Sequence, residues 1–88
     1  MCYILKQVQK ILSHQFCVSE ESIQPEAEFV RDLGSDSYQI LEIMAAFELT
    51  FDIEIDYDSV PNIITVQDAI FYIQRKIDDN NNLQKYLI

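Results

Sequence analysis

Apolar residues near the start of the chain recur at helical spacing. They fall at positions i, i+1, i+4, i+7 and i+8, one stripe of an amphipathic helix: Ile4, Leu5, Val8, Ile11 and Leu12. We predict a first helix over this stretch that ends near Phe16.

A second apolar stripe begins a few residues after residue 37. Its members are Ile40, Leu41, Ile43, Met44, Phe47 and Phe51. Ser35 and Asp36 stand just before it, and both are good N-capping residues. We predict a second helix from residue 37 to about residue 50.

The last helix is expected to begin at a capping box. Thr65-Val66-Gln67-Asp68 has the required hydroxyl and acid at the right spacing. An apolar side follows, made of Val66, Ala69, Ile70, Ile73 and Ile77. The polar run at residues 78–82 interrupts this pattern. We expect residues 83–88 to form a frayed tail or a small amphipathic extension.

The connection at residues 17–36 is long and contains Pro25 and the chain's only glycine, Gly34. It also holds five apolar residues, Val18, Ile23, Phe29, Val30 and Leu33, which a wholly solvated linker would not need. We expect a loop pinned to the core, with a short helical turn before Gly34. Loops of this length in compact domains usually carry function.

Residues 51–57 alternate apolar and acidic side chains, which is typical of a strand. A single strand would have no pairing partner here, so we instead predict a short element that ends before Pro61. The expected fold is all-α: a bundle of three main helices plus one short helix, with a long loop between the first and second helices.

The charge of the chain favours some partners over others. The 88 residues carry a formal charge of −9, and residues 20–68 hold thirteen acids and one base, Arg31. Such a field repels nucleic acid and anionic headgroups and attracts basic protein surfaces. The alternative is a solvated acidic face that only aids solubility.

No segment has the length of a transmembrane helix, and the first residues do not resemble a signal peptide. Cys2 and Cys17 do not make a disulfide framework. We expect a reduced, cytoplasmic monomer that does not insert into membranes.

Candidate chemistry concentrates where the second helix begins. Ser37 places a hydroxyl at a helix N-terminus, where unpaired amides favour a phosphodiester, and Gly34 leaves room for another protein to approach. The alternative is that Ser37 only caps the helix and Gly34 only makes a turn. No metal-ligand spacing occurs, and no nucleophile has a base nearby, so we expect no metal site and no enzyme.

The motif around this serine resembles the attachment site of acyl carrier proteins, usually Asp-Leu-Gly-x-Asp-Ser-Leu. Here it reads Asp32-Leu33-Gly34-Ser35-Asp36-Ser37-Tyr38. The family pattern continues in Phe29-Val30-Arg31 before it, in Phe51-Asp52-Ile53-Glu54-Ile55 after it, and in Ile64-Thr65-Val66-Gln67-Asp68-Ala69-Ile70. We therefore expect an acyl carrier domain at residues 1–78 and a C-terminal tail at residues 79–88.

The resemblance implies roles for particular residues. Ser37 would receive 4′-phosphopantetheine from coenzyme A through a phosphopantetheinyl transferase, and Asp36 would help place that enzyme's magnesium. The arm's thiol would carry acyl groups to acyl-transferring or condensing enzymes of fatty acid, polyketide or related lipid biosynthesis, which would dock through basic patches. The implied partner surface is Tyr38, Leu41, Glu42, Ala45 and Glu48. The implied acyl pocket is Ile55, Ile64, Ala69 and Tyr72, which would serve equally as plain core.

The sequence departs from the family pattern in several places. Tyr38 replaces a leucine, Gln39 stands where an acid is frequent, and Ala45 is smaller than usual. A less acidic second helix indicates either a dedicated set of partners or ordinary drift. Cys17 lies where glycine is common, so a positive φ there would strain it.

Two other functions fit the same residues. One is a carrier of aminoacyl or peptidyl groups, which Asp36 disfavours because such carriers tend to have a different residue there. The other is an unmodified acidic adaptor with a carrier-like fold, which would keep its function without the Ser37 hydroxyl.

Overall fold

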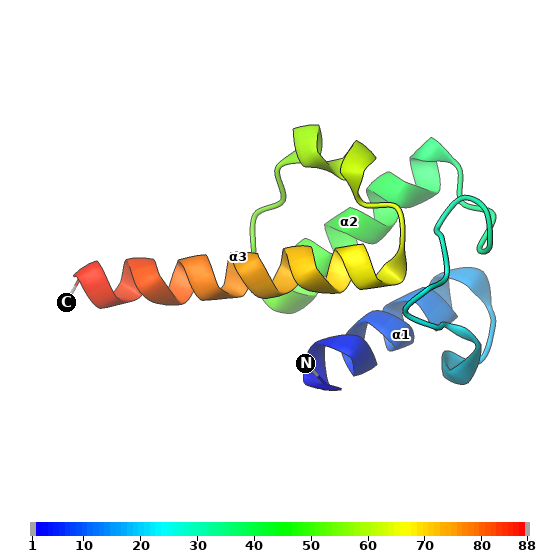
Figure 1. Ribbon diagram of the computed structural model, residues 1–88, viewed down its shortest axis with the longest axis horizontal. Coiled ribbons are helices and arrows are strands. Elements are labelled where there is room, and N and C mark those ends of the chain that lie inside the picture. Colours follow the sequence, from blue (N-terminus) through cyan, green and yellow to red (C-terminus); the bar gives the residue numbers. More distant parts are fainter. Residues whose placement is uncertain (1, 88) are drawn as a thin grey trace.

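The computed structural model describes the backbone of residues 2–87 and the side chains of residues 3–79. Its elements are α1 (Cys2–Phe16), η1 (Glu20–Ser22), α2 (Ser37–Phe51), η2 (Tyr57–Asn62) and α3 (Val66–Leu87), where η denotes a 3₁₀-helix (Figure 1). No strand occurs in the described range, and Glu28 and Thr65 form an isolated bridge. The all-α prediction is confirmed, and so is the rejection of a strand at residues 51–57.

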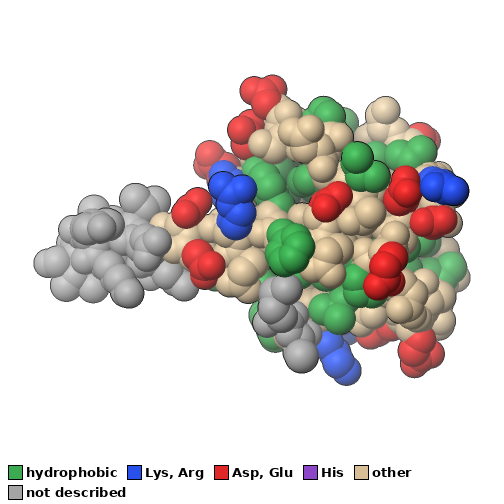
Figure 2. All heavy atoms as spheres, in the orientation of Figure 1, with side chains coloured by type: hydrophobic (Ala, Val, Ile, Leu, Met, Phe, Trp, Pro, Cys, Tyr) green, Lys and Arg blue, Asp and Glu red, His purple; other side chains and the backbone are tan. Residues whose placement is uncertain are grey.

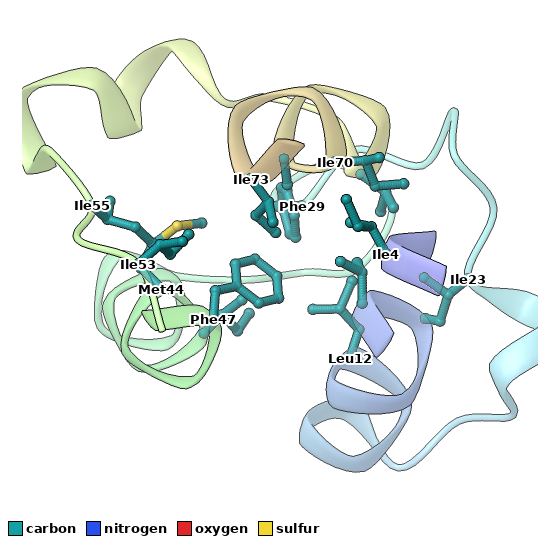
Figure 3. Packing of buried hydrophobic residues seen from close by; sticks show 14 residues of the cluster. Ile4, Leu12, Ile23, Phe29, Met44, Phe47, Ile53, Ile55, Ile70 and Ile73 are labelled. Atoms are coloured by element: carbon teal, nitrogen blue, oxygen red, sulfur yellow. The ribbon is translucent and has the colours of Figure 1, made fainter. Parts of the chain in front are cut away.

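The three long helices enclose one hydrophobic core (Figure 3). Leu12 of α1, Phe47 of α2 and Ile73 of α3 are each at most 1% exposed. Their apolar faces meet because each helix carries a stripe of apolar residues that is removed from water only by packing against the others.

The long loop is anchored to this core by three of its five apolar residues: Ile23 and Phe29 are buried in it, and the partly buried Leu33 packs against it. Ile23 is fully buried and Phe29 is 2% exposed, and both belong to the same core cluster as Ile73 (Figure 3). Val18 and Val30 are exposed instead. The loop contains η1, which the apolar pattern did not predict. It also contains the predicted turn before Gly34, where the Asp32 amide donates to the Glu28 carbonyl at 3.0 Å.

Both α1 and α2 end in a left-handed residue that is not glycine. Cys17 has φ 57° after α1, and Asp52 has φ 54° after α2. In each case the next amide reaches back five residues, Val18 to the Ser13 carbonyl at 3.1 Å and Ile53 to the Glu48 carbonyl at 3.3 Å. This is the Schellman arrangement, which usually employs glycine. The positive φ that would strain a non-glycine residue at position 17 is therefore present.

The α3 helix differs from the prediction at its end. Its capping box forms as expected: the Thr65 Oγ1 accepts from the Asp68 amide, and the Asp68 Oδ2 accepts from the Thr65 amide, both at 3.1 Å. The expected break at residue 78 is wrong, because the helix continues to Leu87 and extends beyond the other helices (Figure 1). The Gln74 Nε2 donates to the Asp78 Oδ1 at 3.0 Å, an i,i+4 pair that supports continuation. The domain boundary at residue 78 stays a prediction.

The short element near Pro61 also differs. It was expected to end before Pro61, whereas η2 includes this residue and ends at Asn62. The Ile63 amide donates to the Val60 carbonyl at 2.9 Å, so Pro61 is the second residue of a turn, where its fixed φ is favourable.

Among the helices described here, none is long and apolar enough to cross a membrane.

Candidate functional site

Asp36, and not Ser37, caps the start of α2. The Asp36 Oδ1 accepts from the Gln39 amide at 2.8 Å, and the Asp36 backbone is extended, as an N-cap requires. Ser37 is the first helical residue and is exposed. The cap therefore leaves the Ser37 hydroxyl out of the helix's own hydrogen bonding and open to solvent.

The turn before the cap depends on Gly34. Its φ is +70°, a conformation that residues with a side chain rarely adopt. A Cβ added at Gly34 would meet no atom within 4 Å, so backbone conformation and not crowding within the chain requires glycine. The open space next to Gly34 is also consistent with the approach of another protein.

Ser35, the other predicted cap, has a different place. It is 5% exposed, and its amide donates to the Phe29 carbonyl at 2.9 Å. Its Oγ is buried and has no hydrogen-bond partner. Ser35 therefore links the loop to α2 through its backbone, while its hydroxyl contributes no contact to the site.

An apolar groove of about 400 Å³ begins at Ser37. It lies between the start of α2, the η2 segment and the turn at residues 28–30, and hydrophobic side chains reach the surface in this region (Figure 2). Its lining is Glu28, Phe29, Val30, Ser37, Ile40, Leu41, Tyr57, Val60, Pro61, Ile63 and Ile64. The groove therefore offers an apolar surface within reach of the hydroxyl.

Most of this lining was not predicted as a site. Val30 was predicted to lie in the long loop, Ile40 on the apolar stripe of the second helix, and Val60 in the short element. Nothing in the sequence indicates that these three residues line one groove. The available signal was the number of apolar residues in the loop and around the short element. Val30 is 63% exposed and Ile64 is 54% exposed, which marks them as surface apolar residues and not core.

The four predicted acyl-pocket residues are not gathered around one cavity. Ile64 lines the groove, whereas Ile55 and Ala69 are buried in the core. The Tyr72 Oη accepts from the Asp56 amide at 2.8 Å, and its ring lies 5.5 Å from the Lys76 Nζ, outside the groove. A pocket built from all four would require this core to open.

The predicted partner surface divides into two parts. Tyr38, Leu41, Glu42 and Ala45 are exposed and share one stripe of α2, since they are three or four residues apart. Glu48 is half-buried, and both its carboxylate oxygens accept hydrogen bonds from the chain itself. Leu49, which was not predicted as a contact residue, is 86% exposed beside this stripe.

Glu48 determines the one clear pKa perturbation beside the groove. Its Oε1 accepts from the Tyr57 hydroxyl at 2.9 Å, and this hydrogen bond raises the pKa of Tyr57 above its ordinary value. Burial and the charge of Glu48 add to the shift in the pKa. The Tyr57 hydroxyl therefore keeps its proton and acts as a hydrogen-bond donor to Glu48. In the part of the chain that is described, no cluster of three or more His, Cys, Asp or Glu residues could hold a metal ion.

The residues present fit a phosphopantetheine group. An exposed hydroxyl that is not needed as a cap is available for a phosphodiester, and the helix N-terminus favours negative charge there. The apolar groove begins at the same residue. No rearrangement of the turn is needed to expose Ser37.

Comparisons with known proteins agree with this geometry. A family model described as the phosphopantetheine attachment site matches residues 6–70. An acyl carrier protein of Nitratidesulfovibrio vulgaris (strain Miyazaki F) is 48% identical over 71 residues, 81% of this chain and 93% of that protein. The acyl carrier protein of strain DP4 is 45% identical over a stretch of the same coverage.

A solved structure supports the same assignment. The acyl carrier protein of Enterococcus faecalis superposes with a TM-score of 0.73 at 28% identity, covering 84% of this chain and 94% of that one. The all-helical fold and the covalent cofactor expected from the motif are thus confirmed. Because the matched region includes the serine motif, the groove and the start of α3, the chain belongs to the acyl carrier proteins, which carry acyl groups on a covalently attached 4′-phosphopantetheine.

Proposed function

We propose that Ser37 is the residue that carries the phosphopantetheine arm. The observation that carries this proposal is the division of roles at the helix start: Asp36 caps α2 and leaves the Ser37 hydroxyl exposed at the mouth of the groove. When attached, the arm supplies a thiol that holds acyl groups as thioesters. The chain itself performs no catalysis in this proposal.

The acyl chain lies in the apolar groove that begins at Ser37. Covering an aliphatic chain removes apolar surface from water, at about 0.8 kcal/mol per buried CH₂. Ile40, Val60 and Ile63 supply apolar surface from two sides of the groove. Of the pocket first implied by resemblance, Ile64 belongs to this site.

Partner enzymes dock on the exposed stripe of α2. Tyr38 and Leu41 supply apolar contacts beside Ser37, and Glu42 supplies the acid for a basic patch. The partners are a phosphopantetheinyl transferase, whose magnesium Asp36 helps to place, and acyl-transferring or condensing enzymes. Fatty acid, polyketide or related lipid biosynthesis stays a prediction, as do the cytoplasmic location and the monomeric state.

Intact mass tests the attachment site. The protein is incubated with coenzyme A, magnesium and a broad-specificity phosphopantetheinyl transferase, beside Ser37→Ala and Ser19→Ala. Ser19 is a matched control because it is an exposed serine just before a short helix and its side chain makes no capping hydrogen bond.

We expect the mass of one phosphopantetheine in the wild type and in Ser19→Ala, and no gain in Ser37→Ala. A gain in mass in Ser37→Ala would show that the arm is attached to another residue. No gain in any folded protein, including with the transferase of the source organism, would favour the unmodified adaptor.

A further inference from the structure

Four hydrogen bonds converge on Glu48. Its backbone carbonyl accepts from the amides of Asp52 and Ile53 at the end of α2. Its carboxylate reaches further along the chain: Oε2 accepts from the Ile55 amide and Oε1 from the Tyr57 hydroxyl, both at 2.9 Å. One residue of α2 thus accepts hydrogen bonds from four residues between the end of α2 and the start of η2.

The η2 helix forms one wall of the groove and has no buried residue of its own. Ile53 and Ile55 are fully buried before this wall, in the same cluster as Met44 (Figure 3), whereas Val60 of η2 packs against the core while only partly buried. Because this packing is partial, hydrogen bonds at both ends of η2 help to fix its position. At its start these come from Glu48 and from the Tyr72 hydroxyl, and past its end the Phe29 amide donates to the Ile64 carbonyl at 3.0 Å.

Glu48 differs in this respect from Glu42, the acid on the same helix. Glu42 is exposed, and its one described hydrogen bond is long, 3.4 Å from the Gln15 Nε2. Both carboxylate oxygens of Glu48 are already engaged at shorter distances. Glu42 is therefore free to meet a basic partner, whereas Glu48 would have to give up contacts within the chain.

We propose that Glu48 is a positioning residue that holds η2 against α2 through Ile55 and Tyr57 and thereby sets the width of the groove. Its carboxylate acts within the chain and does not serve as a docking charge. The functional consequence of this inference rests on the acyl groove proposed above. A groove whose size is fixed in this way should favour acyl chains of a particular length. The hydrogen bonds themselves can be tested without any acyl group.

The first experiment separates the hydrogen bonds of Glu48 from its charge. Glu48→Gln removes the charge, but its amide can still accept from Ile55 and donate to Tyr57. Glu48→Ala removes both contacts. Exchange of the Ile55 amide is measured by NMR in the full unmodified chain, relative to the Val8 amide of α1, with Glu42→Ala as the matched control.

We expect relative exchange at Ile55 to rise roughly tenfold in Glu48→Ala, the change that loss of a charge-assisted hydrogen bond produces. Glu48→Gln should stay within about threefold of wild type, and Glu42→Ala should not differ from it. Equal exchange in Glu48→Ala and wild type would overturn the positioning role.

The second experiment measures the groove. Acyl groups of increasing length are loaded on the arm, and the rise in Tm over the unacylated form is recorded for each length. Tyr57→Phe keeps the ring in the groove wall but removes the hydroxyl, so it is the least disruptive variant. We expect a preferred length in the wild type and in Glu48→Gln, and a flatter profile or one shifted to longer chains in Tyr57→Phe and Glu48→Ala.

The outcomes separate this inference from the function it rests on. A wild-type preference that persists unchanged in Tyr57→Phe and Glu48→Ala would overturn the control of groove width by Glu48. If no chain length raises the Tm of the wild type, the acyl groove fails and its control by Glu48 fails with it. Exchange at Ile55 then still decides whether Glu48 holds the segment.

Discussion

Asp36 accepts a hydrogen bond from the Gln39 amide at 2.8 Å, so the first turn of α2 is capped by the residue before Ser37. A hydroxyl at a helix start commonly serves as the cap itself. Here the aspartate takes that role, and the adjacent serine can be modified without loss of the cap. Neighbouring residues thus divide stability and attachment between them.

This division predicts that two substitutions of Asp36 will behave differently. Asparagine is as good an N-cap as aspartate, so Asp36→Asn should change the free energy of unfolding by only a few tenths of a kcal/mol, whereas Asp36→Ala should lose about 1 kcal/mol. Modification should slow at least tenfold in both, because the proposed magnesium contact needs the carboxylate. Urea unfolding and transferase kinetics are the measurements. Normal modification of Asp36→Asn would remove the carboxylate from that role.

Gly34 is expected to be required for its backbone conformation. Since its φ is +70° and no atom lies within 4 Å of an added Cβ, Gly34→Ala should cost about 1–2 kcal/mol of unfolding free energy without any steric clash. Gly34→Asn should cost less, because asparagine tolerates this region better. Urea unfolding of both variants is the measurement. Equal costs would indicate that the left-handed conformation is not the cause.

Cys17 carries strain that glycine would relieve. Its φ of 57° follows α1, and its side chain is exposed, so little packing is lost on removal. We expect Cys17→Gly to raise the unfolding free energy by about 0.5–1 kcal/mol. Cys17→Ala keeps the Cβ and the strain and should give no comparable gain. A gain in both variants would point to the thiol instead of the backbone.

The Ser35 hydroxyl is buried without a partner, so its removal should help the fold. A buried hydroxyl that is left unpaired costs about 1–3 kcal/mol, and Ser35→Ala should recover roughly 1 kcal/mol of that in thermal or urea unfolding. Ser22→Ala is a contrasting control, because the Ser22 Oγ donates to the Ser19 carbonyl at 2.7 Å. This variant should be slightly less stable than the wild type. Destabilisation of Ser35→Ala would show that its hydroxyl finds a partner in solution.

Asp68 should make stability depend on acid pH. The Thr65 amide is the main cause that lowers the pKa of Asp68, with the Ile64 amide and the Thr65 hydroxyl contributing and burial opposing. A carboxylate whose folded pKa is lowered stabilises above its unfolded pKa, about 3.9, and the stabilisation is lost as pH falls through the folded pKa. At neutral pH Asp68→Asn should cost about 0.3–1 kcal/mol, because the amide oxygen can still accept these hydrogen bonds but the negative charge at the helix N-terminus is lost.

The pH dependence of that difference is the diagnostic measurement. The gap in unfolding free energy between wild type and Asp68→Asn should be constant from pH 7 down to about pH 5 and should shrink below about pH 4. A gap that stays constant down to pH 2 would contradict ionisation of Asp68 as its source.

Residues close in sequence already determine much of this protein. Apolar spacing predicts α1, α2 and the first part of α3, and the box formed by Thr65 and Asp68 marks where α3 begins. These features can be read from sequence because helix periodicity and capping involve residues three or four apart. The serine motif likewise spans a few consecutive residues.

The end of α3 shows where such short-range signals fail. Loss of the apolar stripe after Ile77 predicted a break, yet the helix continues to Leu87. Asparagine and aspartate cost at most about 0.7 kcal/mol each in a helix interior, and no glycine or proline stands after Pro61 to stop it. A polar run removes a reason to be buried, but it does not end a helix.

The groove and its wall were decided only by tertiary structure. Val30, Ile40 and Val60 come from three segments, and they line one groove because the bundle folds those segments together. The same packing buries Ile55 and Ala69 and turns Glu48 toward residues seven and nine positions further along the chain. An exposed acid and an engaged acid look alike in a sequence, because the difference depends on where a distant backbone amide comes to lie.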